Sequence, residues 1–223
     1  MAITTNWAVI AAICGNFWQE STVNPGIWEG LVVGNPGYGL GQWTDNAQVS
    51  RRTALFNYLN SKGYALDSGE GQLEFLVYEN VWNVLGADGS TSIYFTLTDF
   101  LNTTSTDVAS LTREWMYHWE GISDGTENVR ITFAEECYYQ IFMNDDGTRY
   151  PWATGNVYLT RNEAFQNALL IKDYFLNENP PDPPDPPDPP DPPDPPDPPY
   201  PPGPTPTRNK RKGLPPWLIY QIS

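Results

Sequence analysis

The sequence contains little cysteine and little histidine, which limits the kinds of site that it can form. Its two cysteines, Cys14 and Cys137, lie among apolar residues of predicted helices, so we interpret both as small buried side chains. A disulfide between them is the alternative. Because His118 is the only histidine and no cysteine pair has the spacing of metal ligands, we expect no metal site and no cofactor.

Long hydrophobic runs and an excess of basic residues are lacking as well. No segment has the roughly 20 apolar residues that a membrane span needs, and the apolar run 7–14 lacks the basic start and cleavage site of a signal peptide. The chain has 12 Lys and Arg against 27 Asp and Glu, a net charge of −15. Such a charge opposes binding to nucleic acids and anionic membranes. We expect a protein that is made in a cytoplasm and leaves it, if it does, by assembly or lysis.

Proline, by contrast, is abundant and divides the chain into three parts. Residues 180–206 are dominated by a Pro-Pro-Asp repeat, which excludes both helix and sheet. We expect an extended polyproline II spacer there, roughly 80 Å long at about 3.1 Å per residue. Residues 1–179 are long enough for one domain with a sizeable core. With 8 basic and 21 acidic side chains, this domain has a net charge of −13.

Residues 207–223 differ from both preceding parts. A basic stretch, 208–212, is followed by an apolar and aromatic one, 214–222, that is too short to cross a bilayer. We predict a docking tail that binds a partner protein, with a disordered tail as the alternative.

Apolar periodicity in residues 1–179 predicts a mainly helical fold. A first helix should begin after Asn6 and end near Val23, because Asn24-Pro25-Gly26 interrupts it. The second should have Val49, Thr53, Phe56 and Leu59 on its inner face. Further helices are expected at about 44–62, 71–85, 106–119, 127–143, and from Thr160, which has capping-box spacing to Glu163. Residues 24–44 are rich in glycine and predict loops and a short hairpin, so the fold class is mainly α with a small β part.

The residues with the clearest chemical meaning lie at the end of the first predicted helix and just after it. Glu20 follows Phe17 and Trp18, and burial beside aromatic rings raises the pKa of a carboxyl group. Glycosidic cleavage needs such a group to protonate the leaving oxygen. In residues 37–44, Gln42 can hydrogen-bond a sugar amide, and Gly39 and Gly41 let the backbone approach a substrate closely.

Aromatic residues gather around the same stretch. Four of them lie close to Glu20 and Gln42 in sequence: Trp18, Trp28, Tyr38 and Trp43. Sugar faces stack on such aromatic rings. Trp43 is the first choice for stacking, and core packing is the alternative for the others.

This part of the chain resembles the phage tail lysozyme family of the lysozyme-like superfamily. Lytic transglycosylases and goose-type lysozymes show a related pair of motifs. The resemblance is strongest before Leu59, and a weaker match extends it toward Ala134. The residues that carry it are Gly15-Asn16 with Glu20-Ser21, Asn24-Pro25-Gly26, the run from Gly37 to Thr44, Arg52 with Tyr58-Leu59, and Trp119-Glu120 with Arg130 and Ala134.

The resemblance implies a two-lobed helical fold with a groove between the lobes. It also implies cleavage of peptidoglycan glycan strands between N-acetylmuramic acid and N-acetylglucosamine. On that basis Glu20 is the general acid, and Ser21 and Gln42 orient Glu20 and the substrate. Tyr38 and Trp43 complete the expected substrate-binding set.

A second catalytic carboxylate is harder to assign from sequence. Glu29, Asp45 and Glu120 are the candidates. Asp45 lies closest to the Gly-Gln-Trp loop, with capping of the next helix as its alternative role. A muramidase normally uses two carboxylates, whereas a lytic transglycosylase needs only one because a hydroxyl of the sugar attacks. Both reaction types stay open at this point.

The organisation of the chain predicts where such an enzyme acts. An acidic domain on a spacer, with a docking tail and no signal peptide, fits delivery by a phage particle during genome entry. We therefore expect a virion component whose partners are peptidoglycan and, through the tail, other phage tail proteins. The alternative is a non-catalytic glycan-binding or structural tail protein that keeps the fold.

Overall fold

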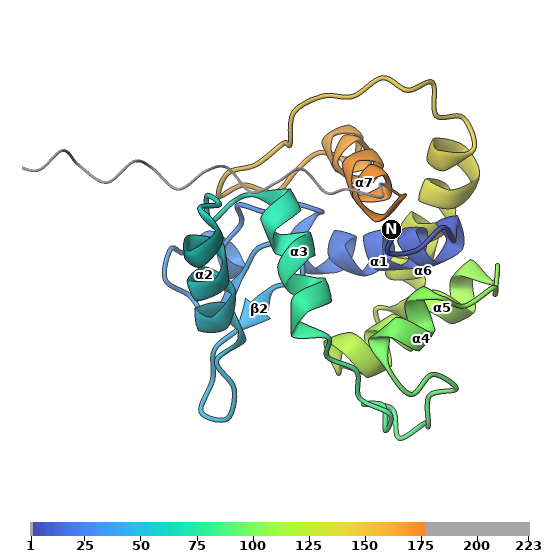
Figure 1. Ribbon diagram of the computed structural model, residues 1–223, viewed down its shortest axis with the longest axis horizontal. Coiled ribbons are helices and arrows are strands. Elements are labelled where there is room, and N and C mark those ends of the chain that lie inside the picture. Colours follow the sequence, from blue (N-terminus) through green and yellow to red (C-terminus); the bar gives the residue numbers. More distant parts are fainter. Residues whose placement is uncertain (1, 177–223) are drawn as a thin grey trace, which may run out of the picture. The chain divides into compact units, whose positions relative to one another are not determined.

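The computed structural model describes residues 2–176, and helices make up most of that part (Figure 1). One small sheet lies between the first two long helices, so the mainly helical prediction is confirmed. The predicted spacer and docking tail lie outside the described residues. In chain order the elements are α1 (Trp7–Ser21), η1 (Glu29–Leu31), β1 (Gly37–Tyr38), β2 (Trp43–Thr44), α2 (Arg51–Lys62), α3 (Gly69–Glu79), α4 (Leu97–Leu101), α5 (Val108–Trp115), η2 (Met116–Glu120), α6 (Glu127–Glu136), η3 (Cys137–Phe142) and α7 (Arg161–Leu176).

The first helix, α1, forms the centre of the domain. It begins as predicted, because the Asn6 side chain accepts a hydrogen bond from the Ala8 amide at 3.0 Å. Every residue from Ala8 to Phe17 is buried, and α1 packs against α5, α6 and α7, which surround it in Figure 1. The helix ends at Ser21, where Thr22 adopts a left-handed conformation with φ of 55°. The burial of α1 fixes its last turn relative to the rest of the domain.

The glycine-rich segment after α1 contains the sheet. β1 and β2 pair antiparallel, with Gly37 opposite Thr44 and Tyr38 opposite Trp43. The side chain of Gln72 in α3 connects the loop between β1 and β2 to two other backbone segments. Its side-chain oxygen accepts from the Leu40 amide at 2.9 Å, and its amide donates to the carbonyls of Pro25 at 2.7 Å and Leu66 at 2.8 Å.

Replacing Gln72 with Leu should therefore destabilise the domain without changing its surface. Gln72 is fully buried, so three backbone groups would lose their partner away from water. We expect the free energy of unfolding to fall by about 3 kcal/mol, since a buried unsatisfied polar group costs about 1–3 kcal/mol. Urea denaturation followed by circular dichroism measures this. Gln140→Leu, at an exposed position, is the matched control; equal effects at the two sites would contradict the prediction.

The middle of the chain departs most from the predicted elements. α2 begins at Arg51 rather than near Thr44, and its buried residues are Leu55 and Leu59, whereas Val49 and Thr53 are exposed. The predicted inner face was therefore partly wrong. α3 ends at Glu79, where Asn80 takes a left-handed conformation with φ of 48°. The predicted continuation to residue 85 is also wrong.

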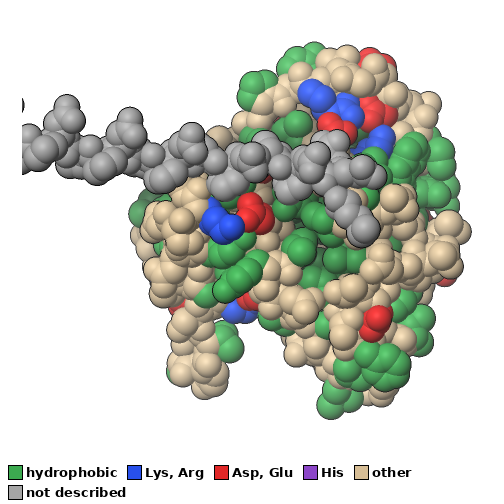
Figure 2. Space-filling model, viewed as in Figure 1, with side chains coloured by type: hydrophobic (Ala, Val, Ile, Leu, Met, Phe, Trp, Pro, Cys, Tyr) green, Lys and Arg blue, Asp and Glu red, His purple; other side chains and the backbone are tan. Residues whose placement is uncertain are grey.

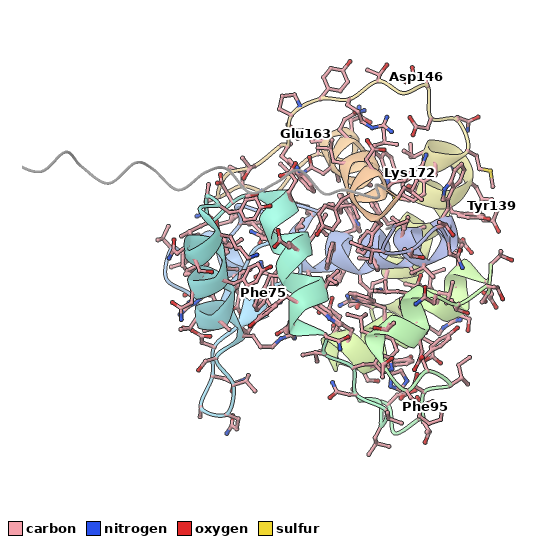
Figure 3. All side chains as sticks on the ribbon, viewed as in Figure 1. Phe75, Phe95, Tyr139, Asp146, Glu163 and Lys172 are labelled. Atoms are coloured by element: carbon pink, nitrogen blue, oxygen red, sulfur yellow. The ribbon has the colours of Figure 1, made fainter. Side chains whose placement is uncertain are left out.

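The segment after α3 contains exposed apolar residues and a short helix, neither of which helical periodicity predicts. Ile93 and Phe95 are each 74% exposed, and Phe95 projects from the surface in Figure 3. The five-residue helix α4 was not predicted. Phe75 of α3, by contrast, is only 2% exposed, and the centre of its ring lies 5.5 Å from that of Tyr58 on α2 (Figure 3). On the face shown in Figure 2, charged side chains are scattered among uncharged ones.

The second half of the domain follows the predicted helices closely. α5 and α6 each continue into a π-helical turn, η2 and η3. The Glu163 carboxylate accepts from the Thr160 amide at 2.8 Å, which confirms the capping box before α7. Cys14 and Cys137 are buried free thiols. Among residues 2–176, none of the helices combines the length and hydrophobicity that a bilayer crossing requires.

Candidate active site

Glu20 lies in the last turn of α1, where its side chain is 20% exposed. The buried helix therefore delivers a carboxyl group to the edge of the core. Its Oε1 accepts a hydrogen bond from Nη2 of Arg130 at 2.6 Å, so the two form an ion pair.

Arg130 of α6 is buried and held by several neighbours. Its Nη1 donates to the side-chain oxygen of Asn16 at 3.0 Å, and its Nε donates to the Thr126 hydroxyl at 2.9 Å. Asn16 in turn donates to the Thr112 carbonyl of α5 at 3.1 Å. This network joins α1, α5 and α6 directly behind Glu20, so the guanidinium is fixed before any substrate binds.

Glu120, at the end of η2, is the second carboxyl group beside Glu20. Its side chain is only partly exposed, and its Oε1 accepts a hydrogen bond from Nε1 of Trp115 at 3.4 Å. Burial and the negative charge of Glu20 raise the pKa of Glu120 well above its ordinary value, and the charges of Arg130 and Arg51 oppose this effect. Glu120 therefore keeps its proton to a higher pH than an ordinary glutamate does.

Arg51, the first residue of α2, completes the charged groups. It binds both carboxylate oxygens of Glu79, at 2.7 and 2.8 Å, and its guanidinium lies 4.6 Å from the centre of the Trp119 ring. Glu79 also accepts from Nε1 of Trp43 at 3.2 Å. Arg51 is thus positioned by α3 and by the aromatic core under the site.

Glu20, Glu120 and Arg51 line one cleft of about 380 Å³, and Arg130 is buried behind Glu20. The cleft volume lies within the usual range for a small-molecule site. The lining residues come from distant parts of the sequence. They include Glu20, Trp28, Gln42, Arg51, Glu120 and Tyr158. The lining thus offers carboxyl groups, a guanidinium group and aromatic rings, which are groups that can bind a polar, flat-faced sugar and transfer a proton to it.

Gln42 and Ser21, the two residues predicted to orient Glu20 and the substrate, differ in their access to the cleft. Gln42 lines the cleft, but its amide donates to the Gly39 carbonyl at 3.1 Å, so this group also holds its own loop. Ser21 is only 1% exposed. Its hydroxyl donates to the Leu40 carbonyl at 2.8 Å, which ties the end of α1 to the same loop. Ser21 is therefore placed to position the loop rather than to contact a substrate.

Trp43 and Tyr38, which were predicted to bind the substrate, do not line the cleft, whereas Trp28 does. Trp43 is fully buried and packs edge-on to Trp119 at 5.9 Å, which corrects the prediction of an exposed stacking ring. Neighbouring strand residues point to opposite faces, and it is Thr44 that lines the cleft. Tyr38 is 4% exposed and packs against Trp28 at 4.8 Å. Burial raises the pKa of Tyr38 to about 12, so its hydroxyl stays neutral.

Asp45 lies outside the residues that line the cleft. Its carboxylate accepts from the Thr53 amide at 3.0 Å and from Arg52 at 3.1 Å, so it caps the start of α2. Partial burial opposes the shift, but these contacts lower the pKa of Asp45. The alternative role predicted for Asp45, capping of the next helix, matches this geometry. Of the other candidates, Glu29 and Glu120 both line the cleft.

Arg51, Arg130 and Tyr158 were not predicted as site residues from the sequence. A basic residue at a helix start or inside a helix is usually a solvated surface residue, so nothing local marks these positions. The partial match of Trp119-Glu120 and Arg130 to a family pattern was the one signal available. Within residues 2–176, no group of His, Cys, Asp and Glu side chains is arranged to hold a metal ion.

Comparison with known proteins identifies the family of the chain. The sequence model of the phage tail lysozyme family matches residues 4–142. The chain therefore belongs to this family, and family membership indicates a lysozyme-like function related to peptidoglycan. It is also similar to Morphogenesis protein 1 of Bacillus phage B103, with 38% identity over 72 residues. That match spans 31% of this chain and only 18% of the phage protein.

Proposed function

We propose that this chain cleaves the glycan strands of bacterial peptidoglycan between N-acetylmuramic acid and N-acetylglucosamine. The observation that carries the proposal is the meeting of Glu20 and Glu120 in one cleft, with Trp28 and Gln42 on its walls. Trp28 gives a sugar ring an aromatic face, since it lies at the cleft surface and is only half-buried.

Glu20 is the proposed general acid. It gives a proton to the glycosidic oxygen as the carbon–oxygen bond breaks, and it is left as a carboxylate. The ion pair with Arg130 stabilises that carboxylate at the moment it forms. A carboxyl group in a solvated helix end would lack this support.

The proposed setting is the virion. Family membership and the resemblance to a phage morphogenesis protein support a component of the particle. We propose that it opens the wall locally during genome entry, and that residues 207–223 bind other tail proteins.

Digestion of purified peptidoglycan by the full chain tests the proposal. We expect mass spectrometry to find fragments with reducing N-acetylmuramic acid ends, because these are the ends that attack by water on the sugar leaves. Anhydromuramic ends would instead identify a lytic transglycosylase. Binding to peptidoglycan without any release of fragments would favour the non-catalytic alternative.

A further inference from the structure

Glu20 and Glu120 have unequal surroundings within the same cleft. Glu20 is paired with Arg130, whose remaining donors are taken by Asn16 and Thr126. Among the described residues Glu120 has no ion pair, and its hydrogen bond comes from the uncharged Trp115 indole. One carboxyl group of the pair is therefore compensated by a cation and the other is not.

The charges facing Glu120 come from every element around it. Glu20 approaches from α1, Arg130 from α6 and Arg51 from α2. Each cation already has a closer carboxylate: Arg130 contacts Glu20, with Asp124 at 3.9 Å, and Arg51 contacts Glu79. Glu29 adds a further negative charge to the cleft wall. The local charge is balanced best when Glu120 is neutral.

We propose that Glu20 and Glu120 act as an acid pair that holds one proton, with Glu120 as its resting carrier and the source from which Glu20 is resupplied. This inference rests on the proposed function of the site. Burial and the charge of Glu20 raise the pKa of Glu120 well above its ordinary value, which agrees with the geometry. Glu120 acts through Glu20 and is a positioning residue for the proton.

The proton balance of the cycle is complete without another reactant. At rest Glu120 holds the proton and Glu20 is a carboxylate paired with Arg130. Glu120 passes its proton to Glu20, Glu20 gives it to the leaving oxygen, and Arg130 stabilises the carboxylate that remains. The water molecule that attacks the sugar loses a proton to solvent, and Glu120 regains one from solvent, which restores the pair. The net reaction adds one water molecule across the glycosidic bond.

The dependence of the cleavage rate on pH tests this pairing in the full chain. In the parent, the fall in activity at high pH reports loss of the shared proton from the pair. In Glu120→Gln the upper apparent pKa of the pair disappears. We expect that fall to move to lower pH by about one unit or more, which is about a tenfold loss of rate on that limb. Glu135→Gln, an exposed change on α6, should keep the parent profile.

Two results in Glu120→Gln would overturn the inference, provided that circular dichroism shows a native fold. One is a pH profile identical to that of the parent. The other is loss of activity at every pH, which would mean that Glu120 itself acts on the substrate.

A titration by carboxyl NMR does not depend on catalysis. With labelled glutamate in the parent, the Glu120 resonance should titrate well above the ordinary value of about 4.3, and Glu20→Gln should lower its pKa by removing a neighbouring negative charge. Titration of Glu120 near the ordinary value would overturn the pairing. If Glu120 titrates high but the parent cleaves no peptidoglycan, the pair stands and the proposed function fails.

Discussion

Glu20→Gln should reduce the rate of peptidoglycan cleavage by at least about 100-fold while leaving the fold intact. General acid catalysis contributes about 10²–10⁴ in rate, and an amide has no proton of suitable acidity to give to the leaving oxygen. The replacement keeps the size of the side chain, and its carbonyl oxygen can still accept from Arg130. Release of soluble muropeptides from purified peptidoglycan, measured as an initial rate, gives the comparison.

The matched control for this change is Glu135→Gln, which removes the same charge from an exposed position of α6. We expect its rate to equal that of the parent. A folded Glu20→Gln variant with more than a tenth of the parental rate would remove Glu20 from the role of acid. Activity that survives there but is lost in Glu120→Gln would move that role to Glu120.

The second large effect is expected from Gly15→Ala, a change far from the surface. A Cβ at this position would lie 2.3 Å from the backbone oxygen of Arg130 and 2.7 Å from the Cβ of Ala134. Neither atom can rotate away, so α1 and α6 must separate. Overpacking of this kind typically costs about 1–3 kcal/mol, and we expect the upper part of that range, a fall in melting temperature of about 5–10 °C.

Activity should fall together with stability in Gly15→Ala, because the same helix contact sets the distance between Glu20 and Arg130. Gln19→Ala, on the exposed side of α1, is the control and should change the melting temperature little. A Gly15→Ala protein as stable as the parent would show that the two helices can adjust without loss.

Predictions from the sequence worked where the determinants are local. Asn6 and the Thr160–Glu163 pair mark helix boundaries because a cap is formed by residues a few positions apart. Glu20 and Gln42, which both line the cleft, could be proposed for a similar reason, since an apolar helix and a glycine-rich loop are visible in short windows.

The misplaced features depend on contacts between distant segments. Arg130 reaches Glu20 from 110 residues away, and no window around either residue contains that pair. Trp43 was expected to stack on a sugar because it lies near the proposed site in sequence, yet the strand it occupies turns its ring toward Trp119 and Phe75. Which face of a two-residue strand is inward is decided by the packing of α3 and η2 rather than by the strand itself.

The network of Asn16, Thr112, Thr126 and Arg130 has a further consequence for how the molecule works. In the proposed mechanism, the geometry of the acid and its cation is established when the core forms, so no binding energy is needed to organise them when a glycan strand arrives. The cleft wall around Trp28 and Glu29, which would contact that strand, belongs to a different and more exposed part of the chain. Under the proposed function, changes in that segment would alter which glycan is recognised, while cleavage of the bond would depend on the helices behind it.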